Sequence, residues 1–599
     1  MSFDFNIILS KVAAFVRKFV LRSQVYDDPP MHIHFDKLRQ PKRVYDLRKR
    51  YFTFSIKNKD DLYKYLFYAL MLFLIFILPY SSVRTGISDN EWQTVQYVSS
   101  MECGEAAPAD IPFLRSHSLL IDRTVQAVAA WFCPNDPFAA RHVASAVFGW
   151  GAIFVTGLLL LKLLTWRAAF FGALLLFVSP RFTGNAYCNL NASAFAFAYI
   201  FSIYQIYLLF REMPKLKRKR LVLIVAGIIL ACTAHVGGAV LILYLIILAP
   251  LFYFINNPIR KFPTKEYLLN FGGTFIIGIL IALCVYLICW IIYPGNSFLS
   301  VSPTLALSQM TAGTPTVQQL FEGQLVWSNH APTHYLVKYL FITTPLVIFI
   351  CFCLFFCVIK TAVRKTNLIN MLTIALTFLY PVIYFTQHNL NVAEGISQFL
   401  FIYPVLVVMA VVGLESLLQK IDDRYTNVVI VSAAIFLTLL PLRNLILNHP
   451  HSIIYFNEIS GGVHNAYGKY ELDPQRQTNR KACTEFLKIV KEKTLRELCN
   501  DDKKITVCTN GNAACAHFFR NDTSYIDLCF CDYGQRYEHN WDYFISFPYT
   551  LSGYQLKNGL WISDEDRFST ISLERMPIVV IFKNNASDTT IAATTSLQE

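Results

Sequence analysis

Long apolar runs separated by short polar stretches fill most of the chain up to residue 447. A bilayer core of about 30 Å is crossed by roughly 20 apolar helical residues, and about eleven runs approach that length. The predicted spans are 64–83, 142–162, 168–181, 193–210, 220–235, 237–255, 268–293, 339–360, 369–385, 398–418 and 427–446. The run 168–181 is short, and the boundary inside 220–255 has alternatives around His235. The pattern predicts a polytopic α-helical membrane protein.

The pattern changes after residue 447. Segment 448–599 is polar, with helical spacing from Thr484 and buried-strand patterns that begin near Lys504, Trp541 and Pro577. We therefore predict a transmembrane body over 64–447, followed by a small α/β domain over 448–599.

The positions of the basic residues predict the orientation. Short cytoplasmic loops are rich in Lys and Arg, and so are the N-terminal arm, 1–63, and the loops after the fourth, sixth, eighth and tenth predicted spans. The alternate loops are poor in them: 300–336 and 386–397 contain neither residue. We therefore expect a basic cytoplasmic arm, a first exported loop over 84–141, and an extracytoplasmic C-terminal domain.

Composition supports a membrane protein rather than the other classes. The 599 residues are 54% hydrophobic and 16% charged, with a mean hydropathy of +0.40, whereas soluble chains carry about 25% charged residues. These values exclude a purely soluble enzyme, a disordered protein and a nucleic-acid-binding module. The net charge of +13 is a topology signal, so no nucleic-acid partner is expected.

Cysteines gather in the segments predicted to be exported. They are Cys103, Cys133, Cys483, Cys499, Cys508, Cys515, Cys529 and Cys531. Disulfides form in extracytoplasmic compartments, although sequence alone does not give their pairing. A metal site at Cys529 and Cys531 is the alternative, but this spacing by itself is a weak signal.

Two carboxylates, Asp89 and Glu91, follow closely after the first predicted span. A carboxylate in this position is a candidate catalytic base that takes a proton from an acceptor hydroxyl. The alternative is structural, since Asp89 could cap a helix that starts at Glu91.

Other polar residues of the exported loops are candidates for substrate binding. They are Arg84, Arg181, Asn189, His235, His330, His334, Lys338, Glu394 and Gln398. Arg181 could hold a phosphate through two hydrogen bonds, or could snorkel to the interface. His235 has the alternative of a helix-end histidine. His330 and His334 are spaced for one helix face, but Pro332 between them argues against a metal site. We predict no metal site.

Several blocks of sequence, in order along the chain, resemble a known family. They are TGISDNE at 85–91, SPRFTGNAYCN at 179–189, FEGQLVWSNHAPTHYLVKYLFITTPL at 321–346, GISQFLFIYP at 395–404, HPHSIIYFNEISGGVHNAYGKYELD at 449–473 and WDYFISFPY at 541–549. The pattern is similar to that of the C-superfamily glycosyltransferases that use polyprenyl-phosphate sugars. That group includes protein O-mannosyltransferases, aminoarabinose transferases and the bacterial family-39-like membrane proteins.

The resemblance implies a fold and a mechanism. It implies a glycosyltransferase-C-like arrangement of about eleven helices, with Asp89 as general base and an inverting transfer. The expected partners are a polyprenyl-phosphate sugar donor, an extracytoplasmic acceptor (lipid, glycan or protein) and membrane lipids. No cofactor and no divalent metal are expected. The implied location is a bacterial inner membrane, with the C-terminal domain in the periplasm.

The chain also departs from the family pattern. A Lys-Asp pair is expected just after Asn189, where Asn191 and Ala192 stand, and arginines are expected at His235 and Ser397. These losses of charge near the expected donor site keep two alternatives open. One is a transporter or flippase of lipid-linked saccharide, and the other is an inactive membrane scaffold of the same fold.

Overall fold

The computed structural model describes nine segments of the chain and a few isolated positions between 272 and 284. The segments are 59–102, 119–132, 136–212, 217–256, 315–388, 391–421, 423–493, 504–562 and 567–584. The predictions for the arm before residue 59, for most of the span 268–293, and for Cys103, Cys133 and Cys499 lie outside these residues.

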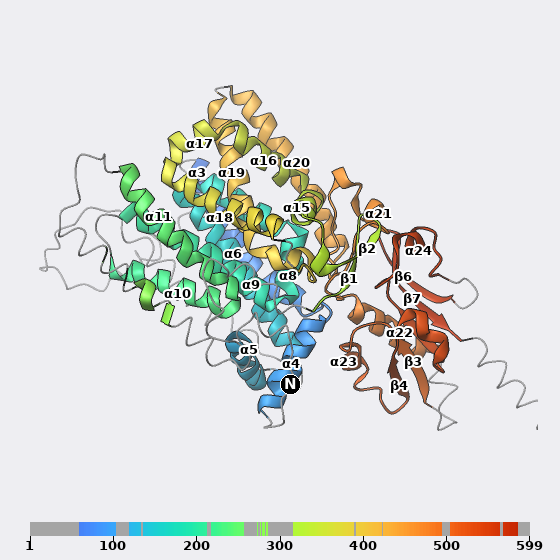
Figure 1. Ribbon diagram of the computed structural model, residues 1–599. Helices are drawn as coiled ribbons and strands as arrows, with labels where there is room; N and C mark the ends of the chain where they lie inside the picture. Colours follow the sequence, from blue (N-terminus) through green and yellow to red (C-terminus); the bar gives the residue numbers. More distant parts are fainter. Residues whose placement is uncertain are drawn as a thin grey trace, which may run out of the picture. The chain divides into compact units, whose positions relative to one another are not determined.

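Six helices among the described residues are long and apolar enough to cross a membrane. They are α3 (Lys59–Ser82), α6 (Pro137–Leu163), α9 (Leu190–Glu212), α18 (Leu368–Gln387), α19 (Tyr403–Lys420) with the 3-10 turn η6 (Gly395–Ile402) before it, and α20 (Arg424–Leu447) (Figure 1). Each coincides with one of the predicted spans.

Other predicted spans differ from the helices that form. The run 339–360 is broken into α15 (Tyr335–Thr343) and α16 (Leu346–Cys357), bent by 118°, because Pro345 has no backbone N–H to continue the helix. Counting this pair as one crossing gives seven. The prediction of one continuous helix there is wrong.

Three more predicted spans are shorter than a straight crossing requires. The run 168–181 forms the 12-residue α7 (Trp166–Phe177), which ends before Pro180 begins α8 (Pro180–Cys188). The run 220–255 forms α10 (Arg218–Ala234) and α11 (Val240–Asn256), of 17 residues each, separated by the turn η2 (Val236–Ala239). The described helices thus support six or seven full crossings and do not establish the predicted eleven.

Small residues let the apolar helices approach closely, as is usual between helices in membranes. In α19, a Cβ on Gly413 would lie 2.6 Å from the carbonyl oxygen of Cys351 in α16. Any larger residue at position 413 would force these two helices apart.

Polar contacts join the helix ends on the side that the sequence predicts to be cytoplasmic. Arg167, at the start of α7, donates two hydrogen bonds of 2.7 Å to the buried carboxylate of Glu415 near the end of α19. Arg211, near the end of α9, donates to the carbonyl oxygen of Lys162 at the end of α6. With 27 residues at 1.5 Å each, α6 is about 40 Å long, so its two ends belong to different surfaces.

The C-terminal segment contains a five-stranded mixed sheet with strand order β4-β3-β5-β7-β6. The strands are β3 (Ile505–Thr509), β4 (Ile526–Phe530), β5 (Tyr543–Ser546), β6 (Arg567–Leu573) and β7 (Met576–Lys583), with the helices α22 (Asn479–Lys493), α23 (Cys515–Phe519) and α24 (Gly553–Lys557) (Figure 1). β3 pairs in parallel with β4 and β5, whereas β7 is antiparallel to β5 and β6. Three of the strands stand where the sequence pattern predicted them.

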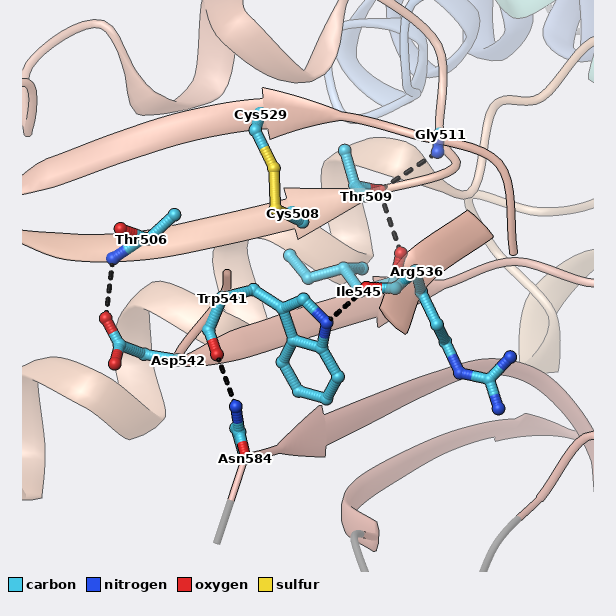
Figure 2. Close-up of a disulfide and its surroundings, with 10 residues drawn as sticks. All are labelled: Thr506, Cys508, Thr509, Gly511, Cys529, Arg536, Trp541, Asp542, Ile545 and Asn584. Atoms are coloured by element: carbon cyan, nitrogen blue, oxygen red, sulfur yellow. Dashed lines mark hydrogen bonds between the residues drawn. A yellow bond between two sulfur atoms is a disulfide. The ribbon is translucent and has the colours of Figure 1, made fainter. Parts of the chain in front are cut away.

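A disulfide joins two neighbouring strands of this sheet. Cys508 in β3 and Cys529 in β4 are register partners, and their sulfur atoms are bonded (Figure 2). The Cys531 sulfur lies within 4.8 Å of both. Because the bond uses the sulfur atoms of Cys508 and Cys529, those atoms are not available as metal-binding thiolates. The geometry therefore favours the disulfide over the metal alternative.

Candidate active site

Segments from all parts of the chain meet around one polar cavity of about 140 Å³. Its walls come from the start of α4 (Asp89–Glu102), the α8–α9 junction, the strand β1 (Gln318–Phe321) with the residues before it, the turn before η6, the segment 471–476 and the loop after β5. The first four of these belong to loops predicted to be exported. Their meeting at one place supports the predicted alternation of the loops.

Asp89 is the first residue of α4 and lines the cavity. Ser88 provides the helix cap, since its Oγ accepts a hydrogen bond from the backbone N–H of Glu91 at 3.2 Å. The alternative in which Asp89 caps a helix starting at Glu91 is therefore wrong. The Asp89 side chain, 37% exposed, pairs instead with Arg476 at 3.2 Å. Burial raises the pKa of Asp89, while the charge of Arg476 and a hydrogen bond from Asn512 oppose that rise.

Glu91 also lines the cavity but belongs to a buried network. Its Oε2 lies 3.1 Å from Nε2 of His142, and its Oε1 lies 3.7 Å from Nε of Arg141. Arg141 is in turn held by Asp122 at 2.6 Å. Within the described residues, Nε and Nη1 of Arg141 have no hydrogen-bond partner. Arg141 therefore brings a buried positive charge with unused donors to the cavity wall.

Glu394 connects three of the loops predicted to be exported. Asn90 donates a 2.6 Å hydrogen bond to its carboxylate, and Asn189 hydrogen-bonds to it as well. Burial raises the pKa of Glu394 to about 7, against the lowering effect of these two hydrogen bonds.

The remaining two carboxylates of the cavity come from the segment that follows the apolar helix α20. Glu471 and Asp473 both line it. Burial raises the pKa of both, to about 7 for Glu471, where the charge of Asp473 adds to the effect. The lining therefore contains five carboxylates, with Arg141 and Arg476 as its guanidinium groups.

The C-terminal domain fixes the first exported loop. Asn479, at the start of α22, donates to the carbonyl oxygen of Ile87 at 2.7 Å and accepts from the Ile87 N–H at 3.2 Å. Asn512 donates to the same carbonyl oxygen at 2.9 Å. At Gly86, a Cβ would lie 2.1 Å from the carbonyl oxygen of Gln477, so only glycine fits there. Asp89 is thus positioned by residues of the C-terminal domain.

The segment before α22 also contacts the other exported loops. Gln475 donates to the side chain of Asn185 in α8, and the N–H of Glu471 donates to the carbonyl oxygen of Leu320 in β1. Asn457 donates to the carbonyl oxygens of Phe341 and Thr344 at the α15–α16 bend. The segment 448–479 is therefore a shared wall for loops that are far apart in sequence.

Some of the residues predicted to bind substrate lie away from the cavity. Arg181 is 1% exposed, donates to the carbonyl oxygen of Tyr455 and stacks on Phe456, so its charge braces the segment 448–479. His235 is buried and accepts from the N–H of Gly237, as a helix-end histidine does. Gln398 lies in η6, and Arg84 is exposed against the ring of Tyr80.

The three candidates in the third loop predicted to be exported lie outside the cavity lining. His334 and Lys338 pair with Glu322 at 3.7 and 3.5 Å. His330 ends a short 3-10 turn, and α15 begins only after His334. Pro332 therefore separates the two histidines, as the sequence argument held.

Of the predicted residues, Asp89, Glu91, Asn189 and Glu394 meet at the cavity, whereas Arg141, Arg476, Glu471 and Asp473 were missed. Arg141 stands beside the start of a predicted span, where positive charge is disfavoured on the exported side. That position was the available signal for it. Arg476 and the two late carboxylates had no signal beyond their closeness to the block 449–473.

Comparison with known proteins finds similar solved structures only. ArnT from Cupriavidus metallidurans in the apo state is 13% identical, with TM-score 0.43 over 86% of this chain and 97% of that one. The Archaeoglobus fulgidus oligosaccharyltransferase in the apo form is 12% identical, with TM-score 0.46 over 85% of this chain and 72% of that one. The S. cerevisiae protein O-mannosyltransferase Pmt1-Pmt2 complex is 13% identical, with TM-score 0.32 over 44% of this chain and 39% of that one. No family model and no curated protein sequence matches the chain.

Proposed function

We propose that this chain is a membrane glycosyltransferase that moves a sugar from a polyprenyl-phosphate donor to an extracytoplasmic acceptor. The observation that carries the proposal is the cavity in which Asp89 and Arg476 meet, beside loops that the sequence predicts to be exported. A lipid-linked donor needs this arrangement, because its chain stays in the bilayer while its headgroup reaches a polar site at the surface. The order of the sequence blocks supports the same class.

In this proposal Asp89 is the general base. Its carboxylate is partly exposed to the cavity, and the neighbouring Arg476 favours its ionised form. The acceptor hydroxyl gives its proton to Asp89 while its oxygen attacks the anomeric carbon. The bond from that carbon to the phosphate oxygen breaks on the opposite face, so the configuration inverts and polyprenyl phosphate leaves.

The donor phosphate is assigned to Arg141 and Arg476. Both guanidinium groups line the cavity, and Arg141 has two unused N–H donors among the described residues. Guanidinium groups bind phosphate oxygens through paired hydrogen bonds. These two arginines take the phosphate-binding role that the sequence analysis had considered for Arg181. No divalent metal and no cofactor enter this scheme.

Purified protein incubated with a panel of polyprenyl-phosphate sugars and extracted envelope acceptors tests the proposal. Wild type should form a glycosidic product, and Asp89→Asn should reduce the rate by about 100-fold or more. Asp527→Asn, which removes an exposed carboxylate of β4, is the matched control and should keep the wild-type rate.

Three outcomes contradict parts of this scheme. Full transfer by Asp89→Asn eliminates Asp89 as base. Movement of lipid-linked sugar across vesicles without any product makes the chain a flippase. If neither activity is found, the chain is a scaffold.

We also propose a bacterial inner membrane with the cavity and C-terminal domain in the periplasm. Labelling of an introduced surface cysteine by an impermeant reagent in whole cells, after outer-membrane permeabilisation, checks this orientation.

A further inference from the structure

Two buried side chains of the cavity lining carry polar atoms that lack a hydrogen-bond partner. Asn191, in the first turn of α9, is 6% exposed, and Gln319, in β1, is 3% exposed. Both residues line the cavity. Within the part of the chain that the structure describes, Oδ1 of Asn191 and Nε2 of Gln319 have no partner. Buried polar atoms are nearly always paired in folded proteins, so these two require an explanation.

Neighbouring contacts hold both residues in place. The hydroxyl of Tyr335, a buried residue of α15, donates a 3.2 Å hydrogen bond to Oε1 of Gln319. At the start of α9, Oδ1 of Asn189 accepts from the backbone N–H of Ala192 at 3.1 Å, and this contact fixes the turn that carries Asn191. A ligand bound in the cavity can therefore supply the missing partners without any rearrangement of the elements that carry these side chains.

The two atoms need partners of opposite kinds. An amide oxygen such as Oδ1 accepts a hydrogen bond, whereas an amide nitrogen such as Nε2 donates one. Hydroxyl groups can do both, while an ammonium group only donates and a carboxylate group only accepts. The five carboxylates of the lining, against two guanidinium groups, also disfavour an anionic ligand. An uncharged ring that carries several hydroxyl groups therefore fits this pair of atoms.

We propose that Asn191 and Gln319 bind hydroxyl groups of the transferred sugar, and that this sugar is uncharged. The inference rests on the proposed transferase function and names the chemical class of its sugar. One sugar hydroxyl donates to Oδ1 of Asn191, and another accepts from Nε2 of Gln319. Neither side chain takes part in the bonds that form and break, so both determine specificity. The neutral amide of Asn191 stands where the family pattern leads us to expect charge, which agrees with an uncharged sugar.

Asn191→Leu tests the proposal, because leucine has a similar size and lacks the acceptor oxygen. With the preferred polyprenyl-phosphate hexose, kcat/KM should fall about tenfold. In wild type, removal of the contacted hydroxyl from the donor should cause a similar loss, whereas in the variant the same removal should cause none. Gln319→Met should behave in the same way toward a different hydroxyl.

Two kinetic outcomes would overturn the proposal. If every deoxy donor loses the same factor in the variants as in wild type, the two side chains do not contact the sugar. If a donor that carries an amino sugar or a uronic acid is transferred faster than every uncharged hexose, the assigned class of sugar is wrong.

Thermal unfolding of the ligand-free protein provides a readout that does not require turnover. Replacement of an unpartnered buried polar group by an apolar one removes a cost of folding, so Asn191→Leu should raise Tm. Asn185→Leu is the matched control and should lower Tm, because the buried amide of Asn185 donates to the carbonyl oxygen of Arg181 and its Oδ1 accepts from Gln475. Equal losses of Tm in the two variants would make Asn191 a structural residue and contradict the proposal.

Ligand-induced shifts of Tm separate this proposal from the proposed function. A ligand that binds the folded protein raises its Tm. Wild type should be stabilised more by a polyprenyl-phosphate hexose than by polyprenyl phosphate without a sugar, and Asn191→Leu should reduce this difference. If the difference is found but wild type transfers no sugar, the proposed function fails and the sugar site stands. If transfer is normal and the two lipids shift the wild-type Tm equally, the sugar site fails and the function stands.

Discussion

The carboxylate of Asp89 lies 3.2 Å from the guanidinium of Arg476, so the first exported loop meets the segment that leads into the C-terminal domain. The same Arg476 stacks on the ring of Tyr549 in that domain. This ion pair gives the cavity its most exposed acid beside one of its two guanidinium groups. Several expectations depend on it and on the contacts around it.

Arg476→Gln should move the acid limb of the pH–rate profile to higher pH. Burial raises the pKa of Asp89 and Arg476 opposes this rise, so removing the guanidinium raises the pKa further. The base must be ionised to act, and activity then falls at a higher pH than in wild type, by about one pH unit. Measurement of kcat/KM against pH checks this. Arg536→Gln is the control, because Arg536 is not among the residues that line the cavity. If the acid limb of Arg476→Gln does not move, the Asp89–Arg476 pair does not set the pKa of the catalytic base.

Glu394→Gln should reduce the pH dependence of phosphate binding near neutrality. The carboxyl of Glu394 has its pKa raised to about 7, so it is largely protonated below that value and charged above it. A charged carboxylate repels the donor phosphate, and the Kd of wild type for polyprenyl phosphate should therefore rise as pH increases through 7. The glutamine variant should bind more tightly than wild type at pH 8, with a smaller change of Kd between pH 6 and 8, because Glu471 in the same cavity still titrates near 7. Titration calorimetry can measure this difference. A wild-type Kd that falls over this range would contradict the assignment.

Asn479→Ala should uncouple the first exported loop from the C-terminal domain. The substitution removes both hydrogen bonds to Ile87 and one to Asn512, at a cost of about 1–3 kcal/mol. Activity should fall more than the free energy of unfolding implies, because Asp89 loses its position. Asn584→Ala, which removes a hydrogen bond to Trp541 elsewhere in the domain (Figure 2), should destabilise the domain without a comparable loss of rate.

Reduction should destabilise the C-terminal domain through one bond. Cys508 and Cys529 close a loop with a sequence separation of 21 residues, which is worth about 2–4 kcal/mol. Thermal unfolding with and without reductant should differ in wild type and coincide in the variant that carries both Cys508→Ala and Cys529→Ala. A reductant effect that persists in the double variant would place the sensitive bond elsewhere.

Arg167→Ala should destabilise the helical body. Glu415 is 2% exposed and receives both hydrogen bonds from Arg167, so the substitution leaves a buried carboxylate without its partner. The cost should be about 3 kcal/mol, since Arg167 itself is partly exposed. Removal of both side chains should restore part of the stability, and a double-mutant cycle in detergent measures this coupling. Strict additivity would show that the pair contributes nothing.

The sequence predicts those features that depend on local pattern. Apolar runs locate α3, α6, α9 and the other long helices, and turn residues locate β3, β5 and β7. Counting from the first span places Asp89 shortly after that span, and the structure has it at the start of α4, the next helix after α3. Pro345 was also a local signal, because proline interrupts a helix. Hydropathy alone does not detect such a break.

Features that depend on distant contacts could not be predicted in this way. Arg181 has the sequence position of a phosphate ligand, yet the segment 448–479 folds over it and buries it against Tyr455 and Phe456. Arg141 and Arg476 reach the cavity only through the packing of α6 and of that same segment. A single sequence gives no sign of which residues will meet across nearly four hundred positions.

The hydrogen bonds that join Asn479 and Asn512 to Ile87 have a consequence for biogenesis. The loop that carries Asp89 emerges early from the ribosome, whereas Asn479 and Asn512, which hold this loop in place, are translated much later. A nascent or prematurely terminated chain should therefore be inserted in the membrane but inactive. Under the proposed function, the incomplete chain would not act on lipid-linked sugars before its C-terminal domain has folded.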